Sequence, residues 1–149
     1  MNAFYYLSFI AIIAGGAISA FTARTPTRLM MWLTAYLVLV VGVIQFGLIY
    51  YWNQLDITPS WPCVTGFVIY NLGNIAVIVG RMLKGNHSAL GCVYLGGIAL
   101  AISMILLIAS TWAAPFNPAH FIYLTFAVVI LISMPIGVTM SARRQKQTK

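Results

Sequence analysis

Acidic side chains are almost absent from this 149-residue chain, in which Asp56 is the single acid. Charged residues of both signs make up 6% of the sequence, whereas they make up about a quarter of an ordinary soluble domain. This composition excludes the water-exposed surface of a soluble protein. The shortage of acids also argues against a proton pump or a carboxylate-coupled antiporter, because such transport normally uses an ionisable side chain inside the membrane.

Cysteine and histidine are also scarce, with two of each. No CxxC pair is present, so the sequence gives no support to thiol–disulfide catalysis. His87 and His120 precede different apolar segments and are predicted to lie on opposite sides of a bilayer, which excludes a metal or haem shared between them within one chain. Nucleotide-binding loops, catalytic triads and paired carboxylates do not appear. The sequence therefore predicts no catalytic residue, no metal site and no cofactor.

Apolar residues dominate instead, at 62% of the chain. They form five segments, each close to the roughly 20 residues that a helix needs to cross about 30 Å of hydrocarbon. Short loops between the segments predict antiparallel packing of consecutive helices. We therefore predict an all-α fold: a polytopic membrane protein whose single domain, residues 1–142, is a bundle of five transmembrane helices. The predicted spans are about 3–23, 30–52, 62–83, 89–112 and 120–141.

Basic residues predict the orientation of the bundle. All eight follow the first, third or fifth segment, in clusters that begin at Arg24, Arg81 and Arg143. The loops on the opposite side, 53–61 and 113–119, contain no Lys or Arg. Because Lys and Arg are retained on the cytoplasmic side of membranes, we predict that the N-terminus is outside and the C-terminus is cytoplasmic.

The same charge pattern bears on both ends of the chain and on its partners. No basic residue precedes the first segment, which favours a retained span over a cleaved secretory signal. Residues 143–149 are predicted to form a basic cytoplasmic tail. Because the positive charge is explained by topology, we predict no nucleic-acid partner. The predicted partners are the lipid bilayer, other membrane-protein subunits and copies of the chain itself.

Three glycines mark a helix-packing seam in the third segment. Gly66, Gly73 and Gly80 follow one another at intervals of seven residues, so they share one narrow face of a helix. Small residues on one face let another helix backbone approach closely, which matters in lipid because the hydrophobic effect does not drive helices together there. The sequence therefore predicts a close helix contact along this seam.

Amide side chains form the main polar feature inside the predicted spans. Gln45 lies in the second segment, and Asn71 and Asn74 lie in the third, at depths that overlap within about one helical turn. Two interpretations stay open. The three amides can join helices through hydrogen bonds, or they can line a polar pocket or path for a neutral or zwitterionic ligand, water or a small solute.

Aromatic residues gather near the predicted outer interface, a depth that Trp and Tyr prefer. His120 and Trp112 lie in this region and form a possible contact site for a quinone or a lipid headgroup. An ordinary aromatic belt with an interfacial histidine explains the same pattern.

Three functions remain as hypotheses. The leading one is a small non-enzymatic accessory or structural subunit of a larger membrane complex, since reactive side chains are few and close-packing seams are many. The alternative is a homo-oligomeric small-solute transporter or channel that uses the amides Gln45, Asn71 and Asn74. The third is a lipid- or quinone-interacting membrane enzyme at the outer face. Small size and short loops favour a prokaryotic cytoplasmic (inner) membrane.

Overall fold

The computed structural model of the chain describes residues 1–25, 27–55, 57–83 and 87–147. Within these ranges the fold is all-helical, with five continuous helices and no strand, which confirms the all-helical part of the predicted fold class. The chain divides into two compact units. Unit 1 comprises Met1–Thr58 and Pro115–Tyr123, and unit 2 comprises Pro59–Ala114 and Leu124–Lys149.

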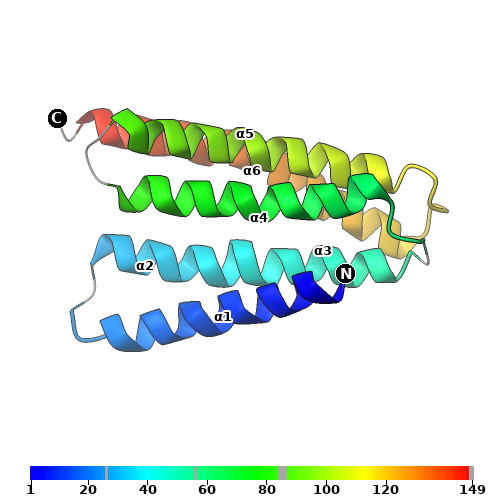
Figure 1. The fold of residues 1–149 in the computed structure, drawn as a ribbon, viewed down its shortest axis with the longest axis horizontal. Helices are drawn as coiled ribbons and strands as arrows, with labels where there is room; N and C mark the ends of the chain where they lie inside the picture. The colour runs from blue at the N-terminus through cyan, green and yellow to red at the C-terminus, as the bar shows by residue number, and fades with distance from the viewer. Residues whose placement is uncertain (26, 56, 84–86, 148–149) are drawn as a thin grey trace. The chain divides into compact units, whose positions relative to one another are not determined.

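Unit 1 is built on two antiparallel helices that lie side by side (Figure 1). The first is α1, Asn2–Thr22. The second runs continuously from Arg28 to Asn53 and consists of three segments: α2 (Arg28–Ala35), η1 (Tyr36–Ile44) and α3 (Gln45–Asn53). Thr27 starts this helix, because its hydroxyl accepts a hydrogen bond from the Met30 N–H at 3.2 Å.

Glycines bring the two helices of unit 1 close together. A Cβ atom on Gly15 would lie 2.6 Å from Val38 Cγ2 and 3.2 Å from the Thr34 carbonyl oxygen. A Cβ atom on Gly42 would overlap the side chain of Ile12. Only residues without a side chain fit at these two positions, so each helix supplies one glycine to the contact.

The central segment η1 is a π-helix of nine residues. The positions of the long helix that meet α1 around it, Thr34, Val38, Gly42 and Phe46, recur every four residues. In an α-helix, each step of four residues overshoots a full turn by about 40°, so this row would wander around the helix. A π-helix has more residues per turn, so each step of four falls short of a full turn, and the π segment offsets the drift of the α segments on either side of it. Packing against α1 therefore explains why the π geometry is retained.

Unit 2 contains α4 (Trp61–Met82) and α5 (His87–Ser110), which pack against each other along their length (Figure 1). Pro62 lies in the first turn of α4, where its missing N–H costs nothing. The last helix, α6 (Pro118–Gln147), begins in unit 1 and continues into unit 2. Its start is set by Asn117, whose Oδ1 accepts a hydrogen bond from the His120 N–H at 2.8 Å.

Four of the five helices are long and apolar enough to cross a membrane: Asn2–Thr22, Arg28–Asn53, Trp61–Met82 and Ser88–Ser110. In α6 the apolar stretch within the part searched is shorter, Pro118–Ser133. Large apolar side chains are exposed along the outer faces of the helices; on α4 these are Val64, Val68, Leu72, Ile75 and Val79. Exposed apolar faces of this extent are suited to lipid rather than water. The helices therefore indicate a membrane protein.

Several predicted features lie outside the described residues. Asp56 and Lys84 belong to this group, as do the side chains of the predicted basic tail. The backbone of α6 runs through this tail as far as Gln147.

Candidate functional site

Gln45 is the central polar residue of unit 1, at the first position of α3. Its side chain is fully buried, and its Nε2 donates a hydrogen bond to the Phe4 carbonyl oxygen of α1 at 2.9 Å. The hydroxyl of Ser8, also fully buried, donates to the same oxygen at 2.9 Å. Gln45 therefore joins the long helix to the N-terminal turn of α1 through a backbone atom.

The other end of the Gln45 amide has a different environment. Its Oε1 is buried and accepts no hydrogen bond within the described part of the chain. Exchanging the amide oxygen and nitrogen does not remove the problem, because it would place two acceptors, the Gln45 and Phe4 oxygens, 2.9 Å apart. An unsatisfied acceptor in apolar surroundings is costly, so this oxygen marks a place for a hydrogen-bond donor.

A second link between α1 and α3 lies close to the end of unit 1. Asn53 Nδ2 donates to the Tyr5 hydroxyl at 3.0 Å, although Asn53 itself is exposed. The rings of Tyr5 and Phe9 both meet Phe46 edge to face, with centroids 5.3 and 5.5 Å apart. Sequence reasoning missed this cluster. The sequence signal that could have identified it is the four-residue spacing of Tyr5 and Phe9, which places both rings on one face of α1.

The two asparagines predicted to act with Gln45 belong to unit 2, and their environments differ. Asn71 is half-buried, and its Nδ2 donates to the Phe67 carbonyl of its own helix at 2.8 Å. Asn74 is buried, and its side chain is hydrogen-bonded to that of Tyr70, which is also buried. Three residues of separation thus place one amide on the half-exposed side of α4 and the other among buried side chains.

The predicted glycine seam faces α5. A Cβ atom on Gly66 would lie 2.9 Å from Leu107 Cγ, and one on Gly73 would lie 3.0 Å from the Gly96 carbonyl oxygen. The approach is closest at Gly80, where a Cβ atom would lie 2.7 Å from the Ala89 carbonyl oxygen. All three glycines therefore let the backbone or side chains of α5 fill the space that a side chain would occupy.

Gly96 on α5 completes this seam and was not predicted from the sequence to face it. A Cβ atom on it would lie 2.7 Å from the Gly73 carbonyl oxygen and 2.9 Å from the Val77 backbone nitrogen. Buried positions on α5 alternate at intervals of four and three residues: Ala89, Val93, Gly96, Leu100, Ser103 and Leu107. This heptad-like row is the signal that could have identified Gly96 as the residue that faces α4.

The predicted outer-interface residues occupy contrasting environments. His120 belongs to unit 1, is 6% exposed, and its ring lies 5.9 Å from the ring of Phe116. Trp112 belongs to unit 2 and is 89% exposed. Trp52, a buried aromatic residue of unit 1, packs its ring edge to face against that of Tyr123, with the ring centroids 6.0 Å apart.

Metal-ligating side chains do not cluster in the described ranges, where no group of three or more His, Cys, Asp or Glu residues occurs. Cys63 and Cys92 are free thiols. No protein-family model, curated protein or solved structure matches this chain. The functional argument therefore rests on the buried polar groups and the close helix contacts described above.

Proposed function

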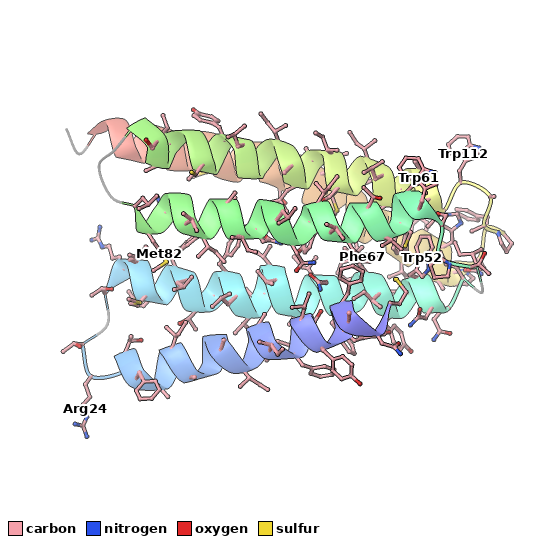
Figure 2. All side chains as sticks on the ribbon, in the orientation of Figure 1. Arg24, Trp52, Trp61, Phe67, Met82 and Trp112 are labelled. Carbon is pink, nitrogen blue, oxygen red and sulfur yellow. The ribbon has the colours of Figure 1, made fainter. Side chains whose placement is uncertain are left out.

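We propose that this chain is a multi-pass membrane protein with five spans, an external N-terminus and a cytoplasmic C-terminus, in a prokaryotic cytoplasmic membrane. The ends of the helices support this topology within each unit. In unit 1, Arg24 and Trp52 lie at opposite ends of the helix pair, and in unit 2, Trp61 and Trp112 lie at the end opposite Met82 (Figure 2). Arg24 is exposed where the cytoplasmic end is proposed, and the exposed Trp61 and Trp112 suit the outer interface.

The role that we propose is that of a non-enzymatic subunit of a larger membrane complex. It is supported by a small-residue surface on α1 that no other described residue contacts closely. Gly16 and Ala20 lie four residues apart on the exposed side of α1, and a Cβ atom on Gly16 would meet nothing within 4 Å. The space beside the neighbouring Gly15 is already filled by the long helix. Gly16 and Ala20 thus offer a second helix the same close approach.

The test is gentle extraction from the native membrane, followed by measurement of particle mass and identification of every chain. The proposal expects other membrane proteins in the particle. Replacing Gly16 with isoleucine should release them, because the new side chain fills the surface on which a partner helix would pack. A particle that contains one copy of this chain and nothing else would contradict the proposal.

Gly47→Ile is the matched control for this variant. Gly47 lies in α3, and a Cβ atom added there also meets nothing within 4 Å. The same substitution at this open position should therefore leave the particle intact. Equal loss of partners in both variants would show that isoleucine disturbs the chain itself rather than a specific surface.

A second candidate function is a homo-oligomeric transporter or channel for small solutes, as favoured by the buried, unsatisfied Oε1 of Gln45. Replacing Gln45 with leucine should then abolish solute flux into proteoliposomes, because a polar atom is lost from the path. Asn71→Leu serves as the control, since the Asn71 side-chain N–H is already bound by its own helix. Unchanged flux in the Gln45 variant would remove this candidate.

A further inference from the structure

In the polar cluster around Gln45, one acceptor atom, the Phe4 carbonyl oxygen, receives several donors, whereas another, the Gln45 Oε1 atom, receives none from the described residues. We call this cluster the Gln45 site; it consists of the Gln45 amide, the Ser8 hydroxyl and the Phe4 carbonyl. The Phe4 oxygen receives both side-chain donors at 2.9 Å, in addition to the N–H that the helix ladder of α1 directs toward it. A carbonyl oxygen has two lone pairs, so this acceptor is crowded.

The Gln45 Oε1 atom, in contrast, has no donor within the described residues although it is buried. Nε2 of the same amide and the Ser8 oxygen share one acceptor, so the Ser8 hydroxyl and the Gln45 amide belong to one polar cluster. A small molecule that donates to Oε1 and accepts from Ser8 would satisfy the amide oxygen and relieve the Phe4 carbonyl in one step. Buried waters commonly act in this way, bridging polar groups that would otherwise be unsatisfied.

The π-helix is an independent observation at the same place. Segment η1 ends at Ile44, the residue immediately before Gln45. The π geometry is rare, and it is found frequently at functional sites. It persists here in a helix whose contact with α1 also holds Ser8 and Phe4 in position.

We infer that the Gln45 site binds one water-sized hydrogen-bond donor, either water or ammonia, which donates to Gln45 Oε1 and accepts from the Ser8 hydroxyl. The size limit follows from burial, because Gln45 and Ser8 are both fully buried and larger molecules have no access without rearrangement. The chemistry follows from the atoms, because the amide oxygen only accepts and the hydroxyl is free to turn. This inference goes beyond the subunit role and does not depend on assembly.

The test is nuclear magnetic resonance of the full chain in lipid nanodiscs, with ¹⁵N in the Gln and Asn side chains. Magnetisation transfer from water protons to the Gln45 amide is expected, and its signal is assigned as the one lost in Gln45→Met. Asn71 provides the internal control, since its amide is bound within its own helix and should show no such transfer. If Gln45→Met does not fold, the Gln45 signal is assigned in the wild type by correlating its side chain with its own backbone, and the same measurement decides the matter.

Two further arms identify the ligand and its second partner. Adding ammonia should leave the Gln45 signal unchanged if water is the ligand, and should shift it and suppress the water transfer if ammonia is. Ser8→Ala should reduce the transfer in either case. If the Gln45 amide shows neither transfer from water nor a shift with ammonia, the inference is wrong.

Discussion

Replacing Gly96 with leucine is expected to destroy the packing of α4 against α5. The new Cβ would lie 2.7 Å from the Gly73 carbonyl oxygen and 2.9 Å from the Val77 nitrogen, both of which are backbone atoms that cannot turn aside. Overpacking costs about 1–3 kcal/mol where side chains can yield, so a whole leucine side chain against backbone should cost about 3 kcal/mol or more. The free energy of unfolding, measured by denaturing the protein with dodecyl sulfate in mixed micelles, reports this loss.

Gly91→Leu is the control, because Gly91 lies on the same helix and a Cβ atom there meets nothing within 4 Å. This variant should be at least as stable as the wild type, since leucine favours a helix over glycine by roughly 0.5–1 kcal/mol. Gly96→Ala should fall between the two. Wild-type stability in both Gly96 variants would mean that the helices are farther apart than in the described structure.

Replacing Tyr70 with alanine is the second change with a large expected effect. Tyr70 is fully buried in unit 2, so its removal leaves a cavity, and large-to-small changes of buried aromatic residues cost about 3–5 kcal/mol. The loss also removes the hydrogen-bond partner of the buried Asn74 side chain. The same unfolding measurement in mixed micelles should show a decrease within this range.

Tyr70→Phe separates the hydrogen bond from the cavity. It keeps the ring and deprives Asn74 of the hydroxyl, which should cost about 1–3 kcal/mol because a buried amide loses its partner. Adding Asn74→Leu should recover part of that loss, and the cycle of single and double variants gives the coupling energy. Coupling near zero would show that the pair contributes no stability. Tyr70 and Asn74 lie four residues apart on one helix, where exposed pairs contribute about 0.2–0.5 kcal/mol, and the burial of both partners here predicts a larger value.

The chemistry of the Gln45 site illustrates the limit of a sequence pattern. Gln45 was predicted as a polar residue with a structural or ligand-binding role, and the sequence suggested amide partners for it. In unit 1 its partner is a backbone carbonyl of α1. Every residue carries such a carbonyl, so no residue type marks this contact in the sequence. Asn71 and Asn74 show the same limit, since both bond within α4, one to the Phe67 carbonyl and the other to the Tyr70 side chain.

Composition and the length of the apolar segments by themselves predicted the number and approximate limits of the helices. The predicted second span, 30–52, corresponds to a helix over Arg28–Asn53, and the third, 62–83, corresponds to Trp61–Met82. Such agreement is expected because a helix in lipid must satisfy its own backbone hydrogen bonds, which makes apolar length the decisive quantity. The seven-residue spacing of Gly66, Gly73 and Gly80 also identified one close-packing face, since that spacing depends only on helix geometry.

Only the tertiary structure decided which residues meet across those faces and what form the helices take. The π geometry of Tyr36–Ile44 serves the contact with α1, and a window of sequence contains no information about a helix packed beside it. Gly96 faces Gly73 because the register of α5 against α4 places it there, and a seam on one helix does not define the register of its neighbour. Local sequence sets which segments are helical, whereas contact with other segments sets their rotation, their register, their local helix geometry and the partners of their buried polar atoms.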